Sequence, residues 1–318
     1  MTLSDIKALA DAIRAEMGKA LVGQDDMIDL LLISLFSAGH ILLEGPPGTA
    51  KTFAAHCFAK TLGLDFRRIQ FTPDLMPGDV LGSNLFNFQT SSFTHTRGPI
   101  FCELLLADEI NRTPPKTQAA LLEAMQERSV TLDGTTHALS DRFMVVATQN
   151  PIEQQGVYPL PEAQLDRFLF KHVLRYPSEE EELRIVSDHG SRFGSPKPES
   201  WGVTQVVSTK QVTTALALIE SNRLADEITA YVVALVRATR TSADLEAGAS
   251  PRAAAMLARA ARAKAALDGR DYVVPDDVKA LAPSVLRHRV ILSPTAQIDG
   301  LRAESIIGKL IDQVEAPR

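Results

Sequence analysis

The sequence has few of the features that mark secreted or membrane proteins. Its 318 residues include two cysteines, Cys57 and Cys102, which form no CxxC pair. Two separated cysteines favour reduced, buried thiols over a disulfide framework. The longest apolar run, 30–36, is broken by Ser34 and is far shorter than the roughly 20 residues of a membrane-spanning helix. Met1–Asp11 is polar and lacks the apolar centre of a signal peptide. We therefore expect a cytoplasmic protein without a membrane span.

An excess of positive charge is also absent. The formal net charge is −6, and 23% of the residues are charged. Broad nucleic-acid binding favours a basic face, so this balance argues weakly against it but leaves room for a local basic channel. Hydrophobic residues make up 45% of the chain, which is enough to bury the core of one large domain or of two smaller ones.

The spacing of apolar residues indicates helices first and then alternating strands and helices. Between Ile6 and Leu21, and between Met27 and Phe36, apolar residues recur at helical spacing. Short apolar runs then alternate with helical stretches such as Thr52–Leu62 and Lys116–Arg128, a pattern typical of parallel β-α-β units. The runs are 41–43, 68–71, 104–107, 143–147 and 168–174. We predict an α/β fold whose parallel sheet is covered by helices on both faces.

Two segments that interrupt this alternation are predicted to be β-hairpins. In one, Phe86, Phe88 and Phe93 surround the polar residues 89–92. In the other, the segment 130–139 is centred on Asp133-Gly134, a favoured hairpin turn. An ordinary surface loop is the alternative for each.

A change of composition near residue 178 predicts a domain boundary. A charged helix begins at Glu179, and a loop rich in Gly, Ser and Pro follows at 190–202. Helices rich in Ala and Leu are then expected at 226–240, 251–267 and 275–286, two of them with helix-start signals at Ser250-Pro251 and Pro275-Asp276. We expect residues 1–178 to form the α/β domain and residues 179–318 to form a smaller all-α domain.

A glycine-rich loop follows the first apolar strand, Ile41–Glu44, and precedes a helix. It reads Gly45-Pro46-Pro47-Gly48-Thr49-Ala50-Lys51-Thr52. A phosphate-binding loop requires this context, because glycines let several N–H groups face one anion and the helix adds its positive dipole end. Lys51 would reach the β- and γ-phosphates, and Thr52 would ligate Mg²⁺. Ala50 replaces the glycine that usually precedes the lysine, but it is small, so we expect the loop to keep its curl.

Acidic and amide side chains follow two later strands. Leu104–Ala107 leads into Asp108 and Glu109, and Phe143–Thr148 leads through Gln149 into Asn150. Ligands bind at the carboxyl ends of parallel strands. Asp108 would hold Mg²⁺ through its water shell, Glu109 would activate the attacking water, and Asn150 would bond the γ-phosphate or that water. A solvated acidic pair and a turn-forming Asn before Pro are the alternative interpretations.

Strand, phosphate loop, acidic strand end, polar strand end and helical tail together resemble AAA+ ATPases. Three narrower stretches resemble the MoxR group of that family. The resemblance covers most of residues 20–178 and covers the helical tail weakly. The three stretches are Glu109-Ile110-Asn111-Arg112-Thr113-Pro114-Pro115-Lys116-Thr117-Gln118, Ala147-Thr148-Gln149-Asn150-Pro151-Ile152-Glu153 and Tyr158-Pro159-Leu160-Pro161-Glu162-Ala163-Gln164-Leu165-Asp166-Arg167-Phe168.

The resemblance implies a role for each matching residue. Lys51 and Thr52 correspond to the Walker A positions, and Asp108 and Glu109 correspond to Walker B. Asn150 corresponds to sensor 1. The implied cofactors are ATP or ADP and Mg²⁺, and the implied reaction is hydrolysis of ATP to ADP and phosphate.

Further matches lie outside these strand ends. Val22-Gly23-Gln24 corresponds to the segment that lines the adenine pocket. Arg167 corresponds to the arginine finger that reaches the ATP of a neighbouring subunit, and Arg252 to sensor 2, which would contact the γ-phosphate from the helical lid. A surface salt bridge with a nearby acid is the alternative for Arg167, and a helix-end arginine is the alternative for Arg252. Arg112 is a second candidate for a contact between subunits.

A finger supplied by a neighbour implies a homo-oligomeric ring, and a hexamer is the expected form. ATP binding would close the α/β domain against the lid through Arg252. In the MoxR group the clients are often proteins with a von Willebrand factor A domain, whose folding, metal loading or activation the ring promotes. The two predicted hairpins match inserts that face the pore or the substrate in related rings.

Three other functions remain open from the sequence. One is a magnesium-chelatase-like subunit that drives metal insertion into a tetrapyrrole. Another is a nucleic-acid motor, which the acidic balance disfavours. A third is a scaffold that binds ATP without turnover, which the pair Asp108-Glu109 argues against.

Overall fold

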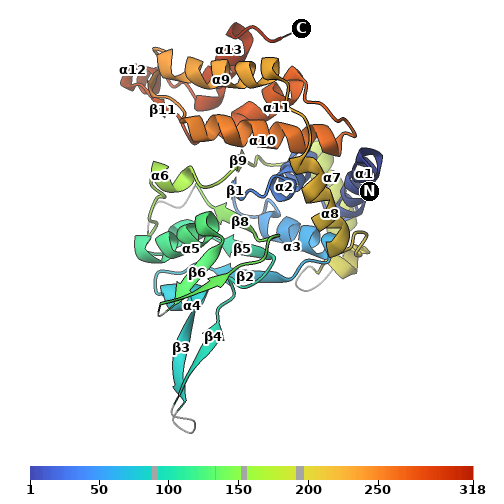
Figure 1. Ribbon diagram of the computed structural model, residues 1–318, viewed down its shortest axis with the longest axis vertical. Coiled ribbons are helices and arrows are strands. Elements are labelled where there is room, and N and C mark those ends of the chain that lie inside the picture. The colour runs from blue at the N-terminus through green and yellow to red at the C-terminus, as the bar shows by residue number, and fades with distance from the viewer. Residues whose placement is uncertain (88–91, 133, 152–155, 191–196, 318) are drawn as a thin grey trace.

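The structure, a computed structural model, describes residues 1–87, 92–132, 134–151, 156–190 and 197–317. Its centre is a five-stranded sheet in the order β2-β5-β8-β1-β9, in which every pair is parallel. The predicted parallel α/β fold is therefore confirmed (Figure 1). The strands are β1 (Ile41–Glu44), β2 (Phe66–Gln70), β5 (Leu104–Asp108), β8 (Met144–Gln149) and β9 (Phe170–Val173).

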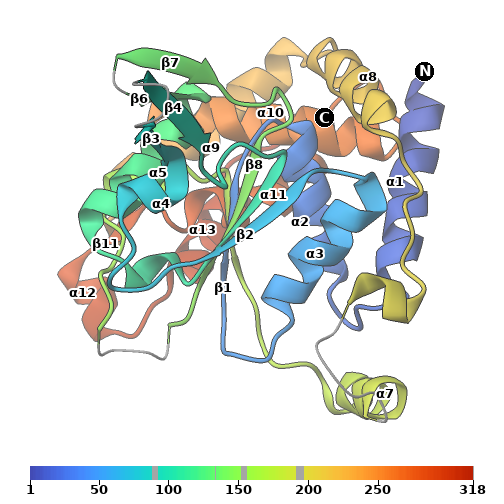
Figure 2. The ribbon, with the colours of Figure 1, turned by 90° about the horizontal axis from the view of Figure 1, so that it is seen from below.

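The centre of the sheet is buried on both faces because its three central strands, β5, β8 and β1, are apolar up to their polar carboxyl ends. Every residue of β5 is buried, and successive side chains of a strand point to opposite faces. Leu104 and Leu106 therefore join one apolar cluster, whereas Leu105 and Ala107 join another. Figure 2 shows the two helical layers on either side of the sheet. One layer is α1 (Leu3–Met17), α2 (Asp25–Phe36) and α3 (Lys51–Leu62), and the other is α4 (Pro77–Leu81) and α5 (Pro115–Glu127).

Two antiparallel strand pairs lie where hairpins were predicted. The first joins β3 (Gly82–Asn87) to β4 (Ser92–Arg97) and extends away from the helical end of the molecule (Figure 1). The second joins β6 (Ser129–Leu132) to β7 (Thr135–Ala138). Phe88 and Asp133, on which parts of those predictions depended, lie outside the described residues.

The C-terminal part is a helical layer above the sheet. Ser250 begins its central helix, α10, by accepting a hydrogen bond from the N–H of Ala253, and Pro251 fits the first helical position because it has no N–H to satisfy. The fully buried alanines of α10 let it pack closely against α9, α11, α1 and α2. The elements are α9 (Asp226–Thr241), β10 (Leu245–Ala247), α10 (Pro251–Leu267), α11 (Pro275–Leu286), β11 (Ile291–Leu292), α12 (Pro294–Ile298) and α13 (Ala303–Gln313).

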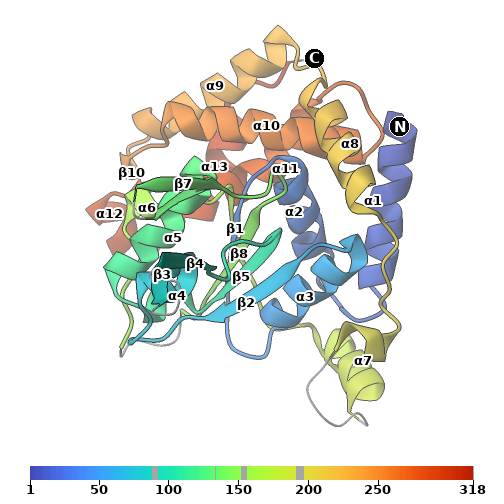
Figure 3. The same cartoon turned by 60° about the horizontal axis from the view of Figure 1, so that its bottom comes forward.

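The segment between the sheet and this layer lies against the α/β part. The N–H groups of Val206 and Val207 donate to the carbonyl of Thr61 at 3.0 and 3.3 Å, and Lys60 pairs with Glu199 at 2.7 Å. Figure 3 shows the helix that follows, α8, beside α1 and α2. The boundary near residue 178 stays a prediction. The segment contains α7 (Glu179–His189), η2 (Pro198–Trp201) and α8 (Thr209–Glu220), and α6 (Glu162–Leu165) precedes β9.

The apolar runs and the two cysteines of the sequence can be followed into the structure. None of the helices in the described part of the chain is both long and apolar enough to cross a membrane. Cys57 and Cys102 are both buried, and burial raises the pKa of each thiol to about 12.

Candidate functional site

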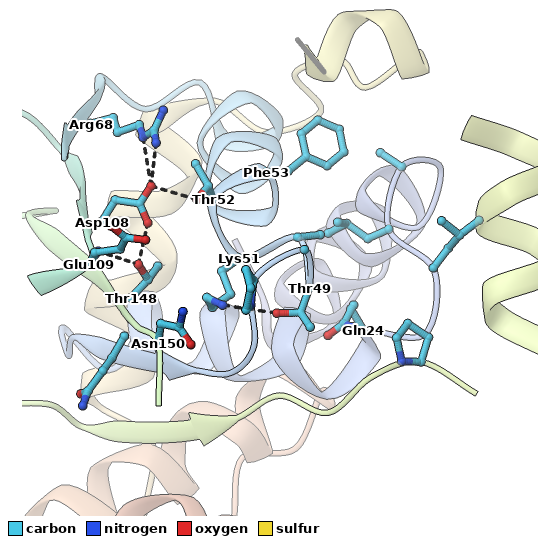
Figure 4. Close-up of a pocket in the computed structure, with 18 of the residues that line it drawn as sticks. Gln24, Thr49, Lys51, Thr52, Phe53, Arg68, Asp108, Glu109, Thr148 and Asn150 are labelled. Atoms are coloured by element: carbon cyan, nitrogen blue, oxygen red, sulfur yellow. Dashed lines mark hydrogen bonds and ion pairs between the residues drawn. The ribbon is translucent and has the colours of Figure 1, made fainter. Parts of the chain in front are cut away.

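The loop between β1 and α3 adopts a tight curl with two residues in the left-handed region. Gly48 has φ 83° and Ala50 has φ 59°. For alanine this conformation costs about 1–2 kcal/mol, which glycine would not incur. The curl expected of Gly45–Thr52 is present all the same, and α3 begins directly after Ala50, at Lys51. The N-terminus of α3 therefore faces the pocket that the loop surrounds (Figure 4).

Lys51 lies within the curl of this loop. Its Nζ donates to the carbonyls of Gly45 at 2.7 Å and Pro46 at 2.8 Å. Burial lowers the pKa of the ammonium, while the charges of Asp108 and Glu109 act in the opposite direction. Thr49 donates to the carbonyl of Pro46 at 2.8 Å, which closes the turn. A cation is thus held at the point where a phosphate-binding loop needs one.

Asp108 is the most heavily bonded side chain of the site. It is 6% exposed. Its Oδ2 accepts bonds from Thr52 Oγ1 at 3.0 Å and from Arg68 Nε and Nη2 at 3.1 and 2.8 Å. Its Oδ1 accepts a bond from Thr148 Oγ1 at 2.6 Å. The hydroxyl and the carboxylate that the sequence assigned to Mg²⁺ therefore touch each other.

Glu109 occupies a strained position beside them. Its φ of 57° is unusual for a residue with a side chain. Its N–H donates to Thr148 Oγ1 at 2.9 Å. Its carboxylate accepts a bond from Gln70 Nε2 at 2.8 Å and lies 3.2 Å from Arg112 Nε. Strain of this kind persists where surrounding contacts hold it, which is common at functional sites.

The sequence analysis missed Arg68, Gln70 and Thr148. Arg68 Nη2 also donates to Gln70 Oε1 at 2.9 Å, so the two β2 side chains connect Asp108 to Glu109. A signal for the first two was present, because residues two apart on a strand share a face. In the run 68–71 the polar residues alternate with apolar ones, and we interpreted the run only as a strand of the sheet.

These residues line one pocket of about 510 Å³, within the usual size range of small-molecule sites. Asn150 also lines it and is 8% exposed. Apolar side chains, among them Val22 and Phe53, also line the pocket. Gln24 also lines the pocket, whereas Gly23 lies against Glu181, where a Cβ would meet the carboxylate at 2.2 Å.

The side-chain oxygen atoms of the pocket suit Mg²⁺ bound to a nucleotide. Mg²⁺ prefers oxygen ligands and is usually held by one or two protein groups together with phosphates and water. Thr52 and Asp108 offer such oxygens beside the phosphate loop. The described residues contain no cluster of three or more His, Cys, Asp or Glu side chains that could hold a metal without phosphate.

Arg167 and Arg252 do not lie in this pocket. Arg167 follows α6, and its Nε donates to Gln126 Oε1 at 3.2 Å. Arg252 lies in the first turn of α10, with Nε 3.7 Å from Asp166 Oδ2. The start of α10 lies above α6 (Figure 1), so the structure does not bring Arg252 to the phosphate loop of its own chain. The two arginines instead flank Asp166 together.

The comparisons with known proteins identify the family of the chain. The family model "ATPase family associated with various cellular activities (AAA)" matches residues 40–170, and an AAA lid model matches residues 237–310. The chain is 44% identical to "Chaperone MoxR1" of Mycobacterium tuberculosis over 95% of its own length and 81% of that protein's. The chain belongs to the MoxR family of AAA+ ATPases. MoxR of Methylorubrum extorquens is 33% identical over 98% of this chain and 95% of its own length.

A solved relative supports the fold along the whole MoxR-family chain. A crystal structure from Cytophaga hutchinsonii superposes with a TM-score of 0.90 at 41% identity and covers 99% of this chain and 97% of its own. A magnesium-chelatase subunit from Arabidopsis thaliana is 28% identical over 62% of this chain and 45% of its own length.

Proposed function

We propose that this MoxR-family ATPase hydrolyses Mg²⁺-ATP in a homo-oligomeric ring, as a hexamer, and uses the cycle to remodel client proteins. One observation in particular supports a ring. Lys51, Thr52, Asp108 and Glu109 meet in one pocket, whereas Arg167 and Arg252 lie together outside it. A complete hydrolytic site therefore needs the arginines of a second subunit.

The roles follow from the contacts around the pocket. Lys51 and the N–H groups of the phosphate loop would bind the β- and γ-phosphates. Thr52 and Asp108 would hold Mg²⁺, which neutralises phosphate charge when bound. Glu109 would orient and deprotonate the attacking water, and Asn150 would bond that water or the γ-phosphate.

The arginines act on the adjacent site in this proposal. Arg167 of one subunit would stabilise the charge that develops on the neighbour's γ-phosphate, an effect of about 10³–10⁵ in rate in other phosphoryl-transfer systems. The expected contact of Arg252 with its own subunit's nucleotide is replaced by a contact beside Arg167. Arg112 is proposed instead to act within its own chain, because it lies 3.2 Å from Glu109.

Mixed rings test the shared site. Arg167→Ala subunits keep an intact phosphate loop, and Lys51→Ala subunits keep an intact finger. Each variant alone should be nearly inactive, and mixtures should regain ATPase activity because each supplies what the other lacks. Activity that stays at the baseline at every mixing ratio would contradict the trans assignment.

For the client we propose proteins with a von Willebrand factor A domain, as the resemblance to the MoxR group implies. The chaperone name of the relative from M. tuberculosis supports a protein client. A Glu109→Gln ring in ATP should hold its client during affinity capture, with Lys51→Ala as the control. Capture of a tetrapyrrole enzyme would favour the chelatase alternative, for which the partial match to magnesium-chelatase subunits is the supporting observation.

A further inference from the structure

A buried arginine of the lid holds the segment that carries Arg167. Arg289 follows α11, and its side chain is 2% exposed. Its Nε donates to Asp166 Oδ1 at 2.7 Å, and its Nη2 donates to the Asp166 carbonyl at 2.9 Å. The same guanidinium also donates to the carbonyls of Phe168 and Leu169. Carbonyl groups on both sides of Arg167 are therefore bonded to one lid side chain.

The neighbouring residue strengthens this attachment. His288 is buried, and its Nε2 donates a hydrogen bond of 3.1 Å to the Phe168 carbonyl. Phe168 is itself fully buried. Two consecutive lid residues thus fix the backbone that leads from Arg167 into β9, the edge strand beside β1.

The energetics indicate that this contact positions the backbone. A buried guanidinium is costly unless its donors are satisfied. Arg289 satisfies them with one carboxylate and several main-chain carbonyls, including that of Val285 in α11. A charge pair alone would leave the backbone of 166–169 free to shift, whereas a planar fork bonded to successive carbonyls does not.

Asp166 connects the contact to the second candidate arginine. One of its carboxylate oxygens, Oδ1, accepts the bond from Arg289, and the other, Oδ2, lies 3.7 Å from Arg252 Nε. The carboxylate next to the candidate finger is therefore bound by two lid arginines. A shift of the lid would therefore act on the residue next to Arg167 through both of them.

We propose that Arg289 is a positioning residue that sets Arg167 according to the position of the lid of the same subunit. The state of one subunit's lid would thereby control the finger that this subunit offers to its neighbour. The inference rests on the proposed function, because it takes Arg167 as the trans finger.

The central test is Arg289→Met, which keeps an extended side chain but removes every donor. Turnover of the pure ring should fall by about 10²-fold, the effect expected when a catalytic group is misplaced by about 1 Å. Affinity for a fluorescent ATP analogue should be unchanged, because the phosphate loop is intact. Mixing with Lys51→Ala subunits should restore activity, because their fingers are correctly held.

Two controls accompany it. Arg287→Met removes the same charge from the same turn, but Arg287 contacts Pro283 and Glu304 within the lid, so its turnover should match the parent. Arg289→Lys keeps the charge but cannot bridge Asp166 and Leu169 together. It should show intermediate turnover and the same restoration on mixing.

The outcomes separate this inference from the proposed function. If Arg167→Ala is restored by mixing but Arg289→Met keeps full turnover, or loses it without restoration, the inference is wrong and the shared site stands. If Arg167→Ala is not restored, the shared site itself is wrong. If neither Arg289 variant forms a ring that binds ATP, Arg289 serves the fold and not the finger, and the inference is again wrong.

Discussion

Asp108 and Glu109 are adjacent in the chain but have different surroundings. Asp108 is bonded through both oxygens to hydroxyl and guanidinium groups. Glu109 has a left-handed backbone conformation. The Thr148 hydroxyl accepts a bond from its N–H, and Gln70 donates a bond to its carboxylate. The first arrangement suits a fixed ligand, and the second suits a base that an adjacent side chain orients.

Glu109→Gln tests this division. The amide keeps the shape of the side chain but cannot accept a proton, so ATP should bind normally while turnover falls about 10²–10⁴-fold, the usual contribution of a general base. Steady-state ATPase assays and binding of a fluorescent analogue measure the two effects. Glu123→Gln, an exposed change on α5, is the matched control. Undiminished hydrolysis would remove Glu109 from its role.

Arg68 gives a second prediction at this scale. Its guanidinium occupies one side of Asp108, so Arg68→Gln should free that carboxylate and strengthen Mg²⁺ binding. Because Arg68 is half exposed, the effect should be modest, roughly two- to fivefold in the Mg²⁺ concentration needed for nucleotide binding. Arg67→Gln, which changes the exposed neighbour paired with Asp65, should leave it unchanged. Weaker Mg²⁺ binding by the Arg68 variant would contradict the prediction.

Local pattern explains which of these residues the sequence revealed. The phosphate loop and the acidic pair are contiguous with their strands, so spacing alone located them. Arg68 meets a carboxylate 40 positions away, and Arg289 meets Asp166 across 123 positions. Such contacts depend on strand order and on lid placement, which no local pattern contains. The contact of Arg252 with its own subunit's nucleotide was implied by the resemblance and stays a prediction.

At the scale of elements, His40 joins three of them. It lies just before β1, its Nε2 bonds the Met125 carbonyl of α5 at 3.2 Å, and its Nδ1 accepts the Val145 N–H of β8 at 3.0 Å. Burial lowers its pKa to about 3, and nearby arginines add to this effect. The bond from Val145 needs the neutral ring, because Nδ1 must accept, and Nε2–H then donates to the Met125 carbonyl.

This pKa predicts how stability depends on pH. The unfolded chain binds a proton at His40 below its ordinary pKa of 6.5, whereas the folded chain does so only near 3. The contribution of His40 to the free energy of unfolding is therefore fully present above pH 6.5. It decreases as the pH falls toward 3, by up to about 1.4 kcal/mol per pH unit. Urea unfolding measures the free energy of unfolding at pH 6.5 and at pH 5. Between these two values the His40→Gln protein should lose about 1–2 kcal/mol less of this free energy than the parent protein does. Equal losses in both proteins would contradict this origin.

The elements themselves were largely predictable. The strand runs and the helix at 251–267 match the observed β1, β5, β8 and α10 within a few residues, because apolar periodicity and caps are local signals. The lid helices could be found but not oriented. Their placement follows from the packing of the alanine-rich α10 against α1 and α2 and of α9 and α11 against α10, which no local pattern contains.

At the scale of the whole molecule, the acidic balance gives a further prediction. The proposed ring should form in the presence of Mg²⁺-ATP. Because the chain has a formal charge of −6, this ring should lack the salt-sensitive binding to DNA that a basic surface provides. Sedimentation of Glu109→Gln with ATP should show hexamers, and fluorescence anisotropy of labelled duplex at low and physiological salt measures the binding. Binding that weakens strongly with salt would favour the nucleic-acid alternative.

The two thiols have a practical consequence for observing such a ring. Thiolates are the reactive form, and those of Cys57 and Cys102 are suppressed by burial in the folded chain. The native protein should therefore be almost inert toward maleimide dyes. Single cysteines introduced on the lid and on the sheet domain could then carry a donor and an acceptor fluorophore, so that lid movement during turnover is followed in rings whose natural cysteines need no replacement.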